Sequence, residues 1–215
     1  MKKLIVVCVL LILPISQHTV AASNVDLRVS GLIVPTACTP LMPGGGLIDY
    51  GTISRQDLNV DRRTRLPVKH LQVNVTCHGP SRFALRMSDN RDGSALVNSE
   101  IYYGLGFDRQ GTPLGVYSMV FDPKRTQVDN AAPIYGTEST TAGLAWRTAN
   151  LNPIYIGARS YLGFTDSEGS TTGPTPIQTL STTVDIEAVI NATQNLDLDT
   201  DTRLDGSATL EVVYL

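Results

Sequence analysis

The sequence has 215 residues, of which 17 are Lys or Arg and 20 are Asp or Glu, so the formal net charge is −3 at pH 7. This length suits one medium-sized domain with a sizeable core. A slightly acidic chain argues against nucleic acid and anionic membranes as partners. The one basic cluster, Arg62-Arg63-Thr64-Arg65, lies beside Asp61 in a polar stretch, and we interpret it as a solvated loop.

Residues 1–22 have the pattern of a secretory signal peptide. Two lysines precede a short apolar run, and Val20-Ala21-Ala22 supplies small residues before a cleavage point at Ser23. The apolar run is too short to span a bilayer as a permanent anchor, and no later segment is apolar enough to span one. We therefore expect an exported chain of residues 23–215 that forms a single domain and has no membrane span after cleavage.

Removal of the signal would leave two cysteines, Cys38 and Cys77. An even count in an exported protein predicts one disulfide, Cys38–Cys77, with two free buried thiols as the alternative. A loop of about 40 residues closed in this way stabilises a fold by about 4 kcal/mol in the chain-entropy model. We do not expect zinc, because neither cysteine belongs to a paired spacing and only His70 and His78 remain.

Strand patterns recur along the chain, whereas helical periodicity is nearly absent. The first candidate strand starts at Asn24 and continues past Gly31 into Leu32-Ile33-Val34. Further candidates, in chain order, are Leu71–Cys77, Arg82–Met87, Tyr102–Phe107, Val116–Phe121, Pro153–Tyr161 and Ser181–Ile190. Residues 122–141 are the least strand-like, and we expect a long surface excursion there. Many short strands separated by Gly and Pro turns predict an all-β sandwich or barrel.

The last candidate strand covers residues 207–215, in which polar and apolar residues alternate from Ser207 to Val212. Ala208, Leu210, Val212 and Tyr214 share one face of this strand. No turn or polar tail follows it in the sequence. If no other strand of the chain covers its free edge, we expect another chain to supply that cover.

Catalytic motifs are missing. The chain has no G-x-S-x-G, H-E-x-x-H, C-x-x-C or P-loop pattern, so we expect neither an enzyme nor a bound cofactor. The acidic run 195–206 resembles a calcium loop, but counting from Asp197 the sixth position is Thr202 instead of Gly and the twelfth is Ala208 instead of Glu. We interpret this run as a solvated acidic loop and expect no metal.

Three segments together carry a family resemblance: Gly31-Leu32-Ile33-Val34-Pro35-Thr36-Ala37-Cys38, the second cysteine at the end of Leu71–Cys77, and the last strand with its penultimate Tyr214. With them the sequence resembles bacterial chaperone-usher fimbrial subunits. It is most similar to a subfamily of fimbrial-like periplasmic proteins that carry a domain of unassigned function. Asp49-Tyr50-Gly51-Thr52-Ile53 and the region 82–94 also look like this subfamily.

The resemblance implies an immunoglobulin-like, pilin-type sandwich that lacks its seventh strand and leaves a groove between its first and last strands. In the family, a periplasmic chaperone lends a strand to this groove and binds the terminal carboxylate of the subunit. At the outer-membrane usher, the N-terminal extension of a neighbouring subunit then replaces the chaperone strand. The implied acceptor residues are Ala208, Leu210, Val212, Tyr214 and the carboxylate of Leu215.

The implied donor residues are Val25, Leu27 and Val29, because their alternation suits insertion into the groove of a partner. The alternative is that they form the subunit's own first strand. The resemblance implies a non-enzymatic structural subunit that passes through the periplasm to a cell-surface fimbrium and contributes to cell adhesion. The alternative function is a soluble periplasmic binding or accessory protein whose sandwich is completed from within, by a strand from residues 116–161.

Overall fold

The computed structural model describes residues 23–31, 37–129 and 133–215. The predicted signal peptide, residues 1–22, and the predicted continuation of the first strand into Leu32-Ile33-Val34 lie outside the described residues. Contacts divide the chain after Val34, and the compact unit covers Pro35–Leu215.

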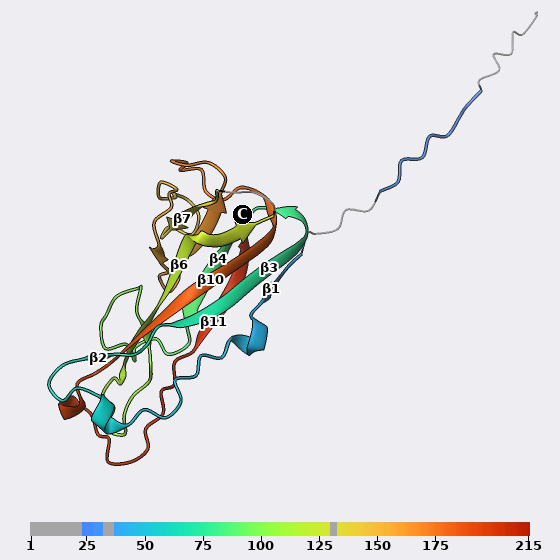
Figure 1. Cartoon of the computed structure of the whole chain (residues 1–215). Coiled ribbons are helices and arrows are strands. Elements are labelled where there is room, and N and C mark those ends of the chain that lie inside the picture. Colours follow the sequence, from blue (N-terminus) through green and yellow to red (C-terminus); the bar gives the residue numbers. More distant parts are fainter. Residues whose placement is uncertain (1–22, 32–36, 130–132) are drawn as a thin grey trace, which may run out of the picture. The chain divides into compact units, whose positions relative to one another are not determined.

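Two antiparallel sheets build the compact unit, which confirms the predicted all-β sandwich (Figure 1). In the order of their pairing, the main strands of the first sheet are β1 (Cys38–Leu41), β3 (Lys69–Ser81), β10 (Ile177–Ile190), β6 (Gly115–Val128) and β5 (Tyr103–Gly104). Two short strands complete this sheet, β2 (Thr64–Arg65) beside β10 and β8 (Ile154–Tyr155) beside β6. The second sheet has the order β11 (Ala208–Tyr214), β4 (Phe83–Asp89), β9 (Tyr161–Thr165) and β7 (Tyr135–Ser139).

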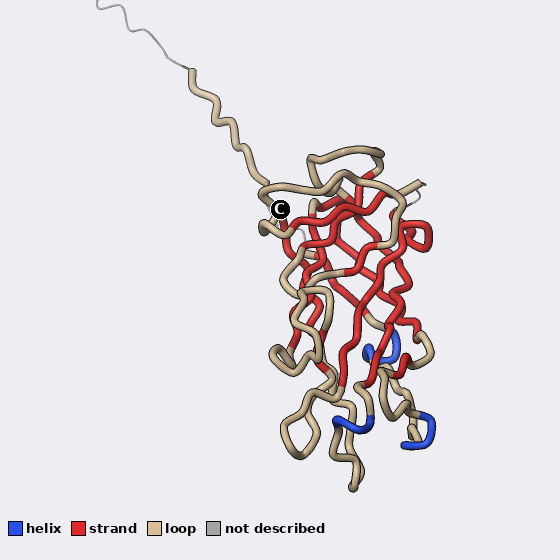
Figure 2. Tube along the Cα trace, turned by 90° about the vertical axis from the view of Figure 1, so that its left-hand side faces the viewer, coloured by secondary structure: helices blue, strands red, loops and turns tan. Residues whose placement is uncertain are grey.

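Helical structure in the described residues consists of three short 3-10 turns, η1 (Pro43–Gly46), η2 (Arg55–Asp57) and η3 (Thr193–Asn195). Figure 2 shows that strands and loops make up nearly all of the unit and that the helical turns lie in its lower half.

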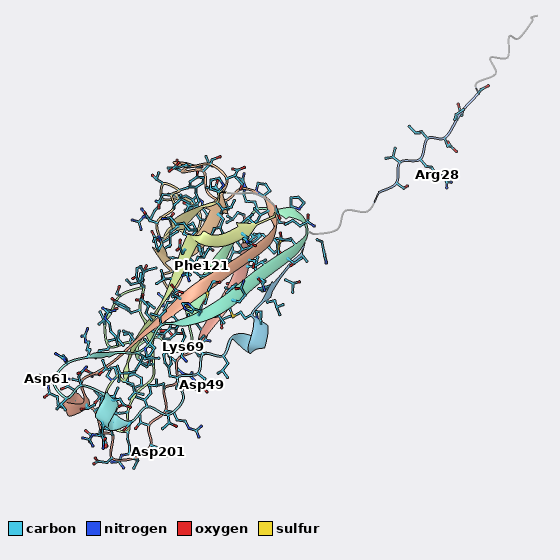
Figure 3. The ribbon with its side chains drawn as sticks, viewed as in Figure 1. Arg28, Asp49, Asp61, Lys69, Phe121 and Asp201 are labelled. Atoms are coloured by element: carbon cyan, nitrogen blue, oxygen red, sulfur yellow. A yellow bond between two sulfur atoms is a disulfide. The ribbon has the colours of Figure 1, made fainter. Side chains whose placement is uncertain are left out.

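The core forms between the sheets because each long strand presents one apolar face. Along β10, every second residue from Leu180 to Ile190 is buried, and the residues between them are only half-buried. Phe121 of β6 and Phe164 of β9 meet across the two sheets with ring centroids 6.4 Å apart. Figure 3 labels Phe121 on β6.

The prediction of a long surface excursion at residues 122–141 is wrong. β6 continues through Val128, and β7 covers Tyr135–Ser139 with four of its five residues buried. Polar residues in these strands interrupt the apolar pattern, but they are buried and hydrogen-bonded. The hydroxyls of Thr126 and Thr182, for example, lie 2.8 Å apart. Buried polar groups that are paired in this way do not produce the apolar alternation on which strand prediction depends.

Two other predicted strands have different bounds. The segment 153–161 is divided into β8 and the start of β9, with Arg159 at a φ of 82° between them. The strand predicted at residues 102–107 is reduced to β5, which is followed by Gly106 at a φ of 85°. A positive φ is incompatible with an extended strand, so the chain turns at both places.

The strand order corresponds to most of an immunoglobulin frame, in which one sheet has the order A-B-E-D and the other contains C, F and G. Strands β1, β3, β10 and β6 take positions A, B, E and D, and β4 and β11 take C and F. The β7–β9 pair extends the second sheet on the side of β4 away from β11. Among the described residues, no strand occupies position G beside β11. Residues 116–161 supply strands only on the opposite flank, so the sandwich is not completed from there.

Candidate functional site

The free edge of β11 is the first component of the candidate site. β11 pairs with β4, and the amide of Leu215 donates to the carbonyl of Arg82 at 3.1 Å while the amide of Asn90 donates to the carbonyl of Ser207 at 2.9 Å. These bonds show that the odd-numbered residues of β11 face β4, because hydrogen-bonded and non-hydrogen-bonded pairs alternate along an antiparallel ladder. The backbone N–H and C=O groups that point away from β4 belong to Ala208, Leu210, Val212 and Tyr214.

The side chains of the same residues form an incompletely covered apolar row. Ala208, Leu210 and Val212 pack against the core but are only half-buried, in contrast to the buried inner residues of β10. Tyr214 keeps 51% of its surface exposed and Leu215 keeps 47%. The edge of β11 therefore combines unpaired backbone groups with apolar surface, which is the combination that an added strand would cover.

The edge of β1 lies beside that of β11. The amide of His78 on β3 donates to the carbonyl of Ala37 at 3.0 Å, so by the same alternation Cys38 and Pro40 direct their backbone groups away from β3. Pro40 has no N–H to offer. The amide of Cys38 donates to the hydroxyl of Tyr214 at 2.6 Å, which joins the two edges at one point. We call these two facing edges the β1/β11 edge.

The predicted disulfide is confirmed. Cys38 and Cys77 are directly paired residues of β1 and β3, with an S–S distance of 2.03 Å and a Cα–Cα distance of 3.9 Å. β1 has only four residues, so its backbone pairing alone is a weak attachment. The disulfide fixes this short strand to β3 and thereby fixes one side of the β1/β11 edge.

The segment that follows β1 closes the lower part of the core. Met42, Ile48 and Tyr50 are half-buried against the core, and the Tyr50 hydroxyl lies 3.4 Å from the carbonyl oxygen of Ile186. The Lys69 ammonium lies 5.6 Å from the centre of the Tyr50 ring. The D-Y-G-x-I motif thus positions a core tyrosine, a role that the sequence analysis did not assign.

The expected donor residues are highly exposed. Val25, Leu27 and Val29 expose 93%, 88% and 91% of their surfaces, and residues 23–31 contain no strand. The strand predicted here is therefore absent from the single chain, because an extended segment needs a paired neighbour to satisfy its backbone. The first strand among the described residues is Cys38–Leu41.

The acidic run before β11 is held by arginines. Asp197 lies 2.9 Å from Arg109, and Asp205 lies 2.8 Å from Arg91. In the part of the chain that the structure describes, no three acidic, His or Cys side chains gather as a metal site would require. Figure 3 places Asp201 of this run, together with Asp61, among the loops at the lower end of the sandwich.

Asp108 anchors this loop end and gives it a pH dependence. The Asp108 carboxylate accepts hydrogen bonds from the amides of Asp197, Gln110 and Thr112 at 2.8, 2.9 and 2.7 Å. The bond from Asp197 and then those from Thr112 and Gln110 hold the pKa of Asp108 below its ordinary value, against the opposing effect of burial. Hydrogen bonds to an ionised carboxylate favour the charged form.

A lowered folded-state pKa adds stability above the unfolded pKa of about 4, and this stability is lost as the pH falls through the folded value. We expect the melting temperature to fall below pH 4 and the Asp108→Asn variant to melt lower at pH 7 with a shallower acid decline. Thermal unfolding between pH 2.5 and 7 measures both. Asp61→Asn, at an exposed loop position, should match the parent. An Asp108→Asn curve parallel to that of the parent would contradict the assignment.

Comparison with known proteins gives matches that fit the motifs. Residues 27–110 match the model of a family described as a protein of unknown function, DUF1120. The chain is also 24% identical to the uncharacterized protein YhcF of Escherichia coli K12, over 91% of this chain and 92% of that protein. It is 24% identical to the protein GltF of the same organism, over 90% of this chain and 89% of the relative.

None of the helices in the described residues is long and apolar enough to cross a membrane. The region that matches the family model contains Cys38 and the D-Y-G-x-I motif at Asp49–Ile53. The match therefore agrees with the resemblance expected from the sequence, to proteins whose domain has no assigned function.

Proposed function

We propose that this protein is an exported, fimbrial-like structural subunit that accepts a β-strand from a partner at the β1/β11 edge. One observation carries the proposal: β11 turns the backbone groups of Ala208, Leu210, Val212 and Tyr214 toward an unpaired edge while the side chains of the first three remain half-buried. A strand added there would satisfy the backbone and cover the apolar row at once. Such β-augmentation is a general mode of recognition, and donor-strand complementation in pilins is one of its named examples.

The partners in this proposal are those that the family resemblance implies. A periplasmic chaperone would donate the first strand, an outer-membrane usher would receive the complex, and a neighbouring subunit would replace the chaperone with its own N-terminal segment. Val25, Leu27 and Val29 are the donor residues in this proposal, and their exposure of 88–93% leaves them free for a partner. The assembled subunit would lie in a cell-surface fimbrium and contribute to adhesion without catalysing a reaction.

The energetics support this arrangement. Burial of an aliphatic side chain contributes about 1.5–3 kcal/mol, so three donor side chains inserted beside Leu210 and Val212 would contribute several times the thermal energy. Backbone bonds to the edge of β11 add a smaller net term but remove the cost of unpaired groups. A single chain without a donor lacks both contributions.

A disulfide ladder in intact cells tests the proposal. Cysteines at Val25, Leu27 or Val29, each combined with Leu210→Cys, would form an intermolecular disulfide if a donor side chain lies opposite Leu210, where cross-strand Cβ atoms are about 5 Å apart. We expect at least one of these pairs to give a ladder of oligomers on a non-reducing gel, which collapses on reduction.

The matched controls place the cysteine at Asp26 or Arg28, which alternate with the donor residues, in the same Leu210→Cys background. Arg28 is labelled in Figure 3. These pairs should give little ladder because their side chains would point away from the core of the partner. Monomers from all three donor pairs, or equal ladders from donor and control pairs, would refute insertion of this segment.

One contact favours a second candidate function. The hydrogen bond from the Cys38 amide to the Tyr214 hydroxyl closes one point of the β1/β11 edge within the chain. This contact favours the alternative of a periplasmic binding or accessory protein that functions as a monomer. A cooperative unfolding transition of the isolated chain that is unchanged by a donor strand would support that alternative.

A further inference from the structure

A cavity of about 300 Å³ lies on the flank of the sandwich opposite the β1/β11 edge. Its walls come from β7, from the segment 147–153 that runs along the free side of β7, and from β8. β7 is the last strand of the second sheet and β8 pairs with β6 near the far side of the first, so strand exchange at β11 leaves this flank untouched.

The floor of the cavity is a carboxylate with unused hydrogen-bonding capacity. The Glu138 side chain exposes only 11% of its surface, and its Oε2 atom lies 3.2 Å from Nη1 of Arg147. Its other oxygen, Oε1, has no hydrogen-bond partner among the described residues. A carboxylate accepts several hydrogen bonds, so Glu138 can still receive donors from a ligand.

The rim of the cavity offers both hydrogen-bond donors and hydrogen-bond acceptors. Arg147 is 78% exposed on its side chain and uses one of the five N–H groups of a guanidinium in the bond to Glu138. Among the described residues, the side-chain amide of Asn152 and the hydroxyl of Tyr155 have no partner, although both residues line the cavity. The rim therefore presents N–H donors, an amide carbonyl and a hydroxyl within one small space.

The charge of the cavity selects a neutral ligand. Glu138 and Arg147 neutralise each other, so a ligand with a net charge would place an unpaired charge beside the nearly buried carboxylate of Glu138, whose charge Arg147 already balances. A ligand with several hydroxyls can donate hydrogen bonds to Glu138 and accept them from Arg147 and Asn152, because each hydroxyl is both a donor and an acceptor. The apolar side chains of Ile101 and Ile154 can contact the C–H face of a ring.

The size of the cavity limits the ligand to one ring. Small-molecule sites in proteins span about 300–1,000 Å³, and this cavity lies at the lower end of that range. We propose that the cavity formed by Glu138, Arg147, Asn152 and Tyr155 binds a neutral cyclic polyol of monosaccharide size.

Binding of free ligands to the whole exported chain, followed by two-dimensional NMR, tests the proposal. The probes are glucose, galactose, mannose and N-acetylglucosamine, with myo-inositol as a cyclic polyol that is not a sugar. We expect at least one probe to bind with a dissociation constant of about 1–10 mM and to shift the signals of residues 136–138 and 147–155. Binding of a sugar points to a glycan unit, and binding of myo-inositol alone points to a polyol headgroup.

Two variants make the test specific. Glu138→Gln and Asn152→Ala should each weaken binding at least about tenfold, whereas Glu211→Gln, which removes an ion-paired glutamate on the opposite flank, should bind like the parent. Asn152 is exposed, so its variant keeps the test valid if Glu138→Gln fails to fold. No binding of any probe up to 50 mM, unchanged binding in both cavity variants, or preferential binding of acetate or glycine would overturn the proposal.

Discussion

A donor strand supplied to the β1/β11 edge should stabilise the compact unit by about 5 kcal/mol, because three apolar side chains become buried at about 1.5–3 kcal/mol each and part of this gain is offset by ordering the strand. The donor is residues 23–31, joined after Leu215 through a flexible linker. For a chain of this size the gain corresponds to a rise of about 10–20 °C in melting temperature. Thermal and chemical unfolding of the chain with and without the fused strand measure it.

The matched control carries the same linker and the same strand with Val25, Leu27 and Val29 replaced by Asn. It retains the backbone of the donor but not the side chains that would enter the core. We expect its melting temperature to lie within a few degrees of the unfused chain. Equal stabilisation by both strands would show that the linker or the added length is responsible, and no stabilisation by the native strand would contradict donor pairing at this edge.

Loss of the Cys38–Cys77 disulfide should also lower the free energy of unfolding strongly. The two cysteines are 39 residues apart in sequence, and the chain-entropy model gives about 4 kcal/mol for a loop of this length. The double variant Cys38→Ser/Cys77→Ser should therefore unfold at a much lower denaturant concentration than the parent. Because the bond fixes β1 to β3, the variant should also lose its response to a fused donor strand.

Reduction of the parent chain provides an independent comparison, since it breaks the same bond without changing the sequence. The reduced parent and the double variant should have similar unfolding midpoints. A double variant that loses less than about 1 kcal/mol would show that the pairing of β1 with β3 is stable without the disulfide.

The strands that the sequence predicts well are those with an uninterrupted apolar face. β10 alternates from Leu180 to Ile190 and β11 alternates from Ala208 to Val212, so periodicity alone located both strands. The half-burial of Leu210 and Val212 agrees with a face that an added strand would cover. The single disulfide followed from the cysteine count. These features depend on local composition, which a sequence displays directly.

Features that depend on distant partners were not predicted. β7 was not predicted because its buried residues include the polar Thr137 and Glu138, both of which bond to Arg147 of the neighbouring segment. The cavity beside this pair was missed for the same reason. The contact of the Tyr214 hydroxyl with the Cys38 amide spans 176 residues, and no local pattern in the sequence indicates it.

Hydrogen exchange at single amides of β11 tests the central claim most directly. In the free chain, the amides of Thr209, Glu211 and Val213 face β4 and should be protected, whereas those of Ala208, Leu210 and Val212 face the open edge and should exchange quickly. Addition of the donor strand should slow exchange only at the second set. Equal protection of both sets in the free chain, or no change at the second set when the donor is present, would contradict a strand-accepting edge.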